Sequence, residues 1–498
     1  MKRKINFLVL VVLIAVSATA AVNGDITRNN NADLKADVVL TVVTRHDVTI
    51  TNEFKEKFLA TEEAQNLGIT DIDFKSVSTD DGWRSLLIDA SKGVDVAWGG
   101  GPALFSTMAN YKALKPMDDA DLVNYLNETV PDRIAGASMK WWDEDNNLLF
   151  VASAISSFGF TVNHQFLSDK GLPVPHTWEE LSSPEFYVSP DVRAISMGDP
   201  PETTSNTRIY QIILQAFGWE KGWEIITKMA ANAGIYPGSV DTRAAVINGE
   251  VGVGMTIDFY GVIAMRENPD CEYIIPEGQS IVNGDPIALG ANVDDYEAAK
   301  AFIKFVESPE GQSVWFTEGL DRLPVLESAF HTPAGQTENG QALYALYNET
   351  LDNEGITFDE ELAVSNLDTT IYYFHETITS NHDLLREAWG SMVLRLKSDN
   401  ITQEKFEELS EQLTEVGMTL NESIDWNDDF QTDPSFASTK RSEWKNFAKQ
   451  KYNAIIDDIG SIPGTENPTT TPTKTPISTM FSLIGFATLV IILRKKRK

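Results

Sequence analysis

The chain has 498 residues, with 40 Lys or Arg against 73 Asp or Glu, so its formal net charge is −33 at pH 7. This length allows two or three domains, and 42% apolar residues indicate a folded protein. The negative charge argues against nucleic acid or an anionic membrane surface as a partner. Cys271 is the only cysteine, so an intrachain disulfide is excluded and core packing must supply the stability.

Both ends of the chain carry membrane signals. Residues 1–20 combine basic residues, an apolar run and a small-residue cleavage site, which is typical of a secretory signal peptide. Residues 477–493 are free of charge and just long enough to cross a bilayer as a helix. The basic residues 494–498 predict that this tail is cytoplasmic and that the rest of the chain is extracellular. Residues 461–476 are rich in Pro and Thr and predict an extended stalk.

The first part of the chain alternates between predicted strands and helices. Strands are predicted over Val38–Val43, Ile72–Val77 and Val94–Trp98, and helices over Asn52–Leu67, Trp83–Ala90 and Ala103–Tyr111. This alternation predicts a parallel sheet with helices on its faces. The glycines that precede Pro102 either let backbone amides approach a ligand at a helix N-terminus or form a loose turn.

A second alternating region follows the predicted strand Leu148–Ala154. The hydroxyl residues Ser156 and Ser157 continue this strand and indicate a crossing between two lobes, where a ligand can be contacted. Further on, the strand Arg193–Met197 leads into the hydroxyl-rich loop Thr203–Asn206. These hydroxyls can simply cap a helix, or they can bind an anion at the end of a strand.

The stretch Glu250–Gly261 is the strongest candidate for a ligand site. Its apolar, glycine-punctuated first half predicts a buried strand, which ends abruptly in Asp258, Phe259 and Tyr260. Ligands of open α/β sheets bind just beyond the carboxyl ends of strands, so this cluster predicts binding. Alternatively, Asp258 is an ordinary cap of the helix that follows.

The last part of the folded chain changes in character. Strands at Tyr273–Pro276 and Ile287–Gly290 are predicted to return to the first lobe, and Tyr296–Val306 predicts an amphipathic helix. Residues 335–460 are charge-rich, poor in glycine and helical in their periodicity. They predict packed helices appended to the lobes and not an independent catalytic domain.

In this order, the pieces resemble an extracellular solute-binding protein of an ABC importer, in the branch that includes ferric-iron, thiamine and phosphonate binders. The resemblance covers roughly residues 37–324, and the C-terminal anchor is similar to that of archaeal-type surface proteins. The segments that carry it are Val38–His46, Asp95–Phe105, Asn163–Leu181, Val253–Tyr260, Ile275–Leu289 and Ala298–Gln312.

The resemblance implies an α/β, two-lobed type II periplasmic-binding-protein fold with a helical C-terminal extension and a C-terminal transmembrane helix. Lobe I would consist of residues 36–155 plus 280–334, and lobe II of residues 156–279. Residues 335–460 would form a helical extension packed on the lobes.

The resemblance also implies ligand contacts on loops of both lobes. They are Thr44, Arg45, His46, Gly100, Gly101, Ser156, Ser157, Thr204, Ser205, Ser239, Asp258 and Tyr260. Iron-binding members usually end the matching strand in two adjacent tyrosines, where this chain has Phe259 and Tyr260. His46 and Tyr260 therefore remain as half of a metal set. Thiamine binders sandwich a ring between aromatic side chains, for which Tyr260 and Trp98 are the candidates.

The function predicted from these features is a membrane-anchored, extracellular substrate-binding component of an ABC transporter. Arg45 and the helix-opening loops favour an anionic group, while Asp258 favours a cationic or hydrogen-donating one. We therefore expect a small anionic or zwitterionic solute, the permease subunits of an ABC transporter as partners, a monomer, and no cofactor. Ferric-iron or thiamine binding by the same fold is the alternative.

Two other classes of function fit the sequence less well. An enzyme is disfavoured because the chain has no H-E-x-x-H, G-x-S-x-G or P-loop motif. A structural or adhesive surface protein would explain the stalk and the N-x-S/T sequons. It would not explain the alternating α/β order with hydroxyl-rich strand ends.

Removal of Ile477–Lys498 is expected to release the remaining chain into the medium, because the Pro/Thr stalk has no apolar segment to hold it in a bilayer. Membrane fractionation of the truncated and full-length chains checks this. If the truncated chain stays with the membranes, it has a second anchor.

Overall fold

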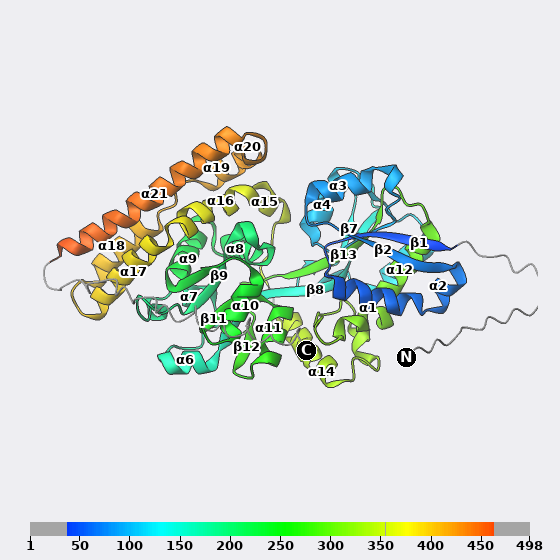
Figure 1. Cartoon of the computed structure of the whole chain (residues 1–498), viewed down its shortest axis with the longest axis horizontal. Helices are drawn as coiled ribbons and strands as arrows, with labels where there is room; N and C mark the ends of the chain where they lie inside the picture. Colours follow the sequence, from blue (N-terminus) through cyan, green and yellow to red (C-terminus); the bar gives the residue numbers. More distant parts are fainter. Residues whose placement is uncertain (1–36, 354, 463–498) are drawn as a thin grey trace, which may run out of the picture.

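The computed structural model describes residues 37–353 and 355–462 of the chain. Figure 1 shows two α/β lobes joined by long strands, with a group of helices along the outer side of one lobe. The signal peptide, the stalk beyond residue 462, the predicted span 477–493 and the basic tail lie outside the described residues. Within those residues, no helix is long and apolar enough to cross a membrane.

One sheet passes through both lobes in the strand order β10-β9-β11-β8-β13-β3-β1-β2. Its central pair, β8 (Leu148–Asn163) and β13 (Val282–Gly290), is antiparallel and connects the lobes. β8 pairs with β13 through its first half and with β11 (Val253–Ile257) through its second half. The predicted crossing at Ser156 and Ser157 is therefore part of one uninterrupted strand.

The parallel sheet predicted for lobe I is present in its first three strands, but the whole sheet is mixed, because β13 is antiparallel to β3. β1 (Val38–Thr44) lies between β2 (Ile69–Ser76) and β3 (Val96–Trp98) and is parallel to both. The helices of this lobe are α1 (Val48–Leu59), α2 (Glu62–Leu67), α3 (Asp80–Ile88), α4 (Pro102–Asn110), α5 (Ala120–Thr129), α12 (Tyr296–Val306) and α13 (Pro309–Gln312). Short strands complete it at β4 (Leu114–Lys115), β5 (Arg133–Ile134), β6 (Ala137–Ser138) and β7 (Lys140–Trp142).

One helix prediction in this lobe is wrong. The segment Asn52–Leu67 forms two helices, α1 and α2, because Thr61 starts a new one. The Thr61 side chain accepts a hydrogen bond from the amide of Ala64 and so caps the N-terminus of α2.

Lobe II contains β9 (Ile195–Gly198), β10 (Ala233–Tyr236), β11 and β12 (Cys271–Ile274). The prediction that Tyr273–Pro276 returns to the first lobe is wrong, since β12 pairs with the second half of β8 and the return is made by β13. The helices are α6 (His164–Lys170), α7 (Trp178–Leu181), α8 (Thr204–Phe217), α9 (Trp219–Asn232), α10 (Ser239–Ile247) and α11 (Asp258–Glu267).

The C-terminal region is helical. Its helices are α14 (Glu338–Asp352), α15 (Glu360–Ser365), α16 (Leu367–Thr377), α17 (His382–Lys397), α18 (Gln403–Thr414), α19 (Leu420–Asp425), α20 (Asn427–Thr432) and α21 (Pro434–Ser461). α14 contributes Leu343, Leu346 and Tyr347 to the core of lobe I. The helices from α16 onward share one hydrophobic core with lobe II.

Specific contacts fix these later helices to lobe II. Phe374 stacks on Tyr210 with 4.5 Å between ring centroids. The Trp389 indole donates to the side chain of Asn232 at 2.8 Å. Arg386 is buried and donates to the carbonyls of Ala231 and Ala233. Because backbone carbonyls neutralise none of its charge, burial lowers the pKa of Arg386 to about 10.

Phe374→Ala is expected to lower the free energy of unfolding by about 3–5 kcal/mol, the usual loss for a buried aromatic ring. Because the core is shared, hydrogen exchange in α9 of lobe II should accelerate as well as exchange in α16. Chemical denaturation with exchange mass spectrometry measures both. The exposed Glu387→Ala on α17 is the control, with a change within about 0.5 kcal/mol. Unchanged exchange in α9 would contradict a shared core.

Candidate functional site

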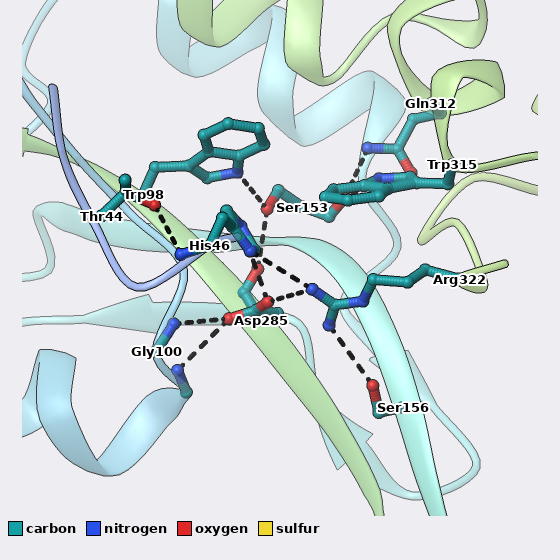
Figure 2. A network of polar contacts seen from close by, with 11 residues as sticks. Thr44, His46, Trp98, Gly100, Ser153, Ser156, Asp285, Gln312, Trp315 and Arg322 are labelled. Carbon is teal, nitrogen blue, oxygen red and sulfur yellow. Dashed lines mark hydrogen bonds and ion pairs between the residues drawn. The ribbon is translucent and has the colours of Figure 1, made fainter. Parts of the chain in front are cut away.

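A buried ion pair lies where the two lobes meet. Arg322 donates through Nη1 to Oδ2 of Asp285 at 2.7 Å, and Asp285 lies on the crossing strand β13. The other carboxylate oxygen of Asp285 accepts from the amides of Gly100, at 2.8 Å, and Gly101, at 3.3 Å (Figure 2). Burial alone would raise the pKa of Asp285, but Arg322 and these donors outweigh burial and lower it.

This arrangement changes the role expected for the glycine loop before α4. The amides of Gly100 and Gly101 were predicted to bind an anionic ligand, and they bind the carboxylate of Asp285. The loop has positive φ angles, 114° at Gly100 and 84° at Gly101, which favour glycine. The amides at the start of α4 thus bind an anionic group, and that group is a side chain of the chain itself.

His46 belongs to the same network and is buried in lobe I. Its ring lies edge-on to Trp98, with centroids 4.4 Å apart, and its backbone amide donates to the hydroxyl of Thr44 at 2.9 Å. Burial lowers the pKa of His46 to about 4, with Asp285 opposing and Arg322 adding to the effect. The imidazole is therefore neutral at pH 7 and packs as part of the lobe I core.

Asp258 connects lobe II to β8, one of the two strands that join the lobes. It is the first residue of α11, and its carboxylate accepts from the amides of Ser157 and Phe259, both at 2.8 Å. Burial raises its pKa to about 6, although these two hydrogen bonds and Arg322 oppose the shift. The hydroxyl of Ser156 accepts from Arg322 at 3.4 Å. The predicted contacts Ser156, Ser157 and Asp258 therefore lie close together, with Ser157 bonded to Asp258 and Ser156 bonded to Arg322.

Three hydroxyl groups meet on the site-facing end of lobe II. The hydroxyls of Ser205 and Ser239 lie 2.6 Å apart, and Thr203 bonds to Ser239. Thr203 caps α8, and Ser239 is the first residue of α10, so the group lies at two helix N-termini. Thr204, which was predicted as a contact, is exposed and lies outside this group, where Thr203 takes its place.

Arg243 is a candidate contact that the sequence analysis missed. It lies one helical turn after Ser239 on α10, and its guanidinium lies 4.9 Å from the centre of the Tyr260 ring. Nε of Arg243 is buried without a hydrogen-bond partner among the described residues. The pKa of Tyr260 is raised, mainly by burial. Asp47 of lobe I adds to this shift, and Arg243 opposes it. Because residues four apart lie on the same face of a helix, the spacing of Ser239 and Arg243 is the sequence feature that could have identified Arg243.

Two further cations complete the site. Arg45 forms an ion pair with Asp80 at the start of α3, and its Nε is buried without a partner among the described residues. Arg322, also missed from the sequence, lies 5.7 Å from the Phe259 ring of lobe II. It is 8% exposed, and its Nε has no hydrogen-bond partner in the described part of the chain. Arg322 thus faces both lobes.

The aromatic sandwich considered for thiamine does not form. Trp98 is fully buried in lobe I, where its indole donates to Ser153 and its ring packs against Phe54. It cannot stack on a ligand together with Tyr260. Across residues 37–353 and 355–462, no three His, Cys, Asp or Glu side chains are grouped so that they could hold a metal ion.

A family model described as bacterial extracellular solute-binding protein matches residues 51–342. The chain belongs to this family. The phosphoglycerate transport regulatory protein PgtC of Salmonella typhimurium is 24% identical over 358 residues, which cover 71% of this chain and 81% of the relative. The periplasmic binding protein AfuA from Actinobacillus pleuropneumoniae, solved with fructose-6-phosphate bound, is 16% identical with a TM-score of 0.50. That alignment covers 68% of this chain and 98% of AfuA.

A protein of an ABC transporter from Clostridium perfringens gives the same TM-score at 16% identity, covering 67% of this chain and 97% of the other. These findings confirm the resemblance to solute-binding proteins of ABC importers and the two-lobed α/β fold. Members of the family bind small solutes and work with permease components in the membrane. The individual ligand contacts remain predictions.

The buried His46 predicts a pH dependence of stability. Between pH 6.5 and about 4, the unfolded chain binds a proton at this position and the folded chain does not, so stability falls as the pH falls. The full effect is about 3 kcal/mol. Asp258 acts with the opposite sign, because its raised pKa stabilises the fold at low pH and this contribution is lost as the pH rises through about 6.

His46→Gln removes the first effect and leaves the second. The stability difference between the wild type and this variant should therefore shrink as the pH is lowered from 7 to 4, measured by urea denaturation at each pH. The exposed His331→Gln serves as the control. Parallel stability profiles for the wild type and His46→Gln would contradict the assignment of a buried neutral imidazole.

Proposed function

We propose that this chain is the membrane-anchored, extracellular binding component of an ABC importer and that it binds a small anionic or zwitterionic organic solute between its lobes. Phosphate esters and phosphonates are the preferred class. The observation that supports this most directly is the group of three hydroxyls, Thr203, Ser205 and Ser239, at two helix N-termini beside Arg243.

The hydroxyl group suits a tetrahedral oxyanion for three reasons. Each hydroxyl can turn its proton toward an acceptor. The N-termini of α8 and α10 carry partial positive charge from their helix dipoles. Arg243, one turn along α10, adds a full positive charge and a donor without a partner among the described residues. A phosphate oxygen would replace the hydrogen bonds that the three hydroxyls now make with one another.

The opposite side of the site belongs to lobe I. Arg45 offers a second cation, while Asp47 is close enough to raise the pKa of Tyr260 across the junction. Because acidic and basic groups lie side by side here, a ligand with both an anionic group and hydroxyl or amino groups fits better than a simple anion. The amides of Gly100 and Gly101 are excluded from this role while Asp285 occupies them.

The relatives supply compounds for testing. PgtC is named for phosphoglycerate transport, and AfuA was solved with fructose-6-phosphate. Both compounds are phosphate esters, which is the class that the hydroxyl group and Arg243 favour. The identities of 24% and 16% do not transfer either ligand to this chain, so both belong in a panel.

Ferric iron fits the site less well. Fe(III) would require Tyr260 as a phenolate together with His46, but the Arg243 guanidinium lies over the Tyr260 ring and His46 is buried in lobe I. A guanidinium beside a trivalent cation is electrostatically unfavourable.

The anchor that would hold the protein at the cell surface is residues 477–493, outside the described part of the chain.

Ser239→Ala is expected to weaken binding of the best phosphate ester by about 1–3 kcal/mol, the usual scale for a hydrogen bond to a charged group. Arg243→Ala should weaken it by at least as much, and Tyr260→Phe by less. Calorimetry against 3-phosphoglycerate, fructose-6-phosphate, inorganic phosphate, ferric citrate and thiamine measures these effects. Thr204→Ala is the matched control, since it removes an exposed hydroxyl from the first turn of α8.

Two results would contradict the proposal. The first is preferential binding of ferric citrate that Tyr260→Phe abolishes. The second is equal affinity of the wild type, Ser239→Ala and Arg243→Ala for every phosphate ester that binds. Native mass spectrometry of the protein purified from its own cells adds an independent arm, because a retained phosphate ester, ferric ion or thiamine differs in mass.

A further inference from the structure

The chain segment that enters the C-terminal helices runs past the lobe junction and contacts both lobes. We call residues 356–366 the clasp segment; it contains α15. It begins beside the start of β13, where the amide of Ile356 donates to the carbonyl of Ser280 at 2.9 Å. Figure 1 shows α15 on the same side of the molecule as α8 and α4, which belong to different lobes. α15 contacts α4 of lobe I.

The contacts of the clasp segment with lobe II are specific and polar. Arg208 of α8 forms an ion pair with Glu360 at 2.9 Å and packs against the Phe358 ring at 4.8 Å. Gln215 exchanges two hydrogen bonds with the backbone of Asp359, at 2.7 and 2.9 Å. One turn earlier on α8, Gln211 donates to the carbonyl of Ala363 at 2.8 Å. These bonds attach α15 along the length of α8.

The contact with lobe I is of a different kind. Among the described residues, no hydrogen bond or ion pair joins α15 to α4, and Val364 of α15 remains 38% exposed. Just beyond the clasp segment, burial raises the pKa of Asp368, and the charge of Asp80, which is itself ion-paired with Arg45, adds to this. Because no polar bond joins α15 to α4 among the described residues, the lobe I side is the one that separates at lower cost.

We propose that the clasp segment is a lid that moves with lobe II and closes against α4 of lobe I, so that solute exchange requires α15 and α4 to separate. Gly100–Gly101 and Thr203–Ser205 lie at the N-termini of α4 and α8, so a helix that contacts both α4 and α8 covers one side of the site. This inference rests on the two-lobed binding function and does not depend on which solute is bound.

A reversible crosslink tests the lid in the full-length chain. Val364→Cys is combined in turn with a cysteine at four positions along α4, namely Ala103, Ser106, Thr107 and Asn110. A short bis-methanethiosulfonate reagent joins the thiols, and reductant releases them. The matched control is Asp359→Cys with Gln215→Cys, which joins α15 to the lobe it already follows. The natural Cys271 is buried, and the wild type with reagent controls for it.

Hydrogen exchange is measured without ligand in peptides that cover residues 99–110 and 199–206. The lid predicts that exchange in both peptides slows about fivefold or more when α15 is joined to α4, because opening then requires the crosslink to break. Reduction should restore the original rate, and the control pair should leave it unchanged. The lid is overturned if the linked and reduced forms exchange alike, if the control pair slows exchange equally, or if none of the four pairs can be linked.

Because no ligand is added, this experiment fails only if the lid is wrong. The calorimetric panel on Ser239→Ala and Arg243→Ala fails only if the proposed ligand class is wrong. The two outcomes are therefore separable.

Discussion

The ion pair between Arg322 and Asp285 is the interaction on which the geometry of the site depends. Asp285 lies on β13, the strand that returns to lobe I, and Arg322 lies between α13 and α14 of that lobe. A buried carboxylate is tolerated only when charge and hydrogen bonds compensate it. Here Arg322 and the amides of Gly100 and Gly101 provide that compensation. The glycine loop, the crossing strand and the start of α4 are thereby held together.

The two lobes differ in how they use helix N-termini. In lobe I, the N-terminal loop of α4 is already neutralised by a carboxylate of the chain. In lobe II, the N-termini of α8 and α10 carry hydroxyls that, within the described part of the chain, bond to one another and to the amide of Asn206. In the proposed function, an external anion therefore binds more favourably at lobe II, whose hydroxyls can turn toward it, than at the loop of lobe I that Asp285 already occupies. In the proposed function, this asymmetry places the anionic end of a solute at lobe II, while Asp47 and Arg45, which is ion-paired with Asp80, leave lobe I to recognise the remainder.

Local pattern was enough for most of the fold, but it was not enough for the site. Strands and helices follow from short-range periodicity, and the predicted helix Tyr296–Val306 matches α12. The split between α1 and α2 depends on a single cap at Thr61, which a periodicity argument overlooks. Similarly, Thr203 and not Thr204 joins the hydroxyl group, because the start of α8 sets which hydroxyl turns inward.

Hydrogen bonds and packing contacts between residues far apart in the chain could not be predicted from the sequence. Nothing near Gly100 indicates that a carboxylate 185 residues away will occupy its amide. Likewise, the sequence around Trp98 is compatible with a ring that stacks on a ligand and with a ring buried in the core. Its contacts with Ser153 and Phe54 decide for the core. The sequence identifies which residue types gather at strand ends. Whether their hydrogen-bonding groups and charges already have partners depends on elements that meet only in the folded chain.

The C-terminal helices change the mechanics of a two-lobed binding protein. Their core is continuous with that of lobe II through pairs such as Phe374 and Tyr210, so we expect lobe II and these helices to move together. α14, in contrast, belongs to the core of lobe I. The chain between α14 and α16 must therefore cross from one body to the other, in parallel with β8 and β13. A third connection restricts the directions in which the lobes can separate, since hinge motion concentrates in the few residues that join rigid parts. In the proposed function, the helical extension therefore acts on solute binding by limiting how the lobes separate.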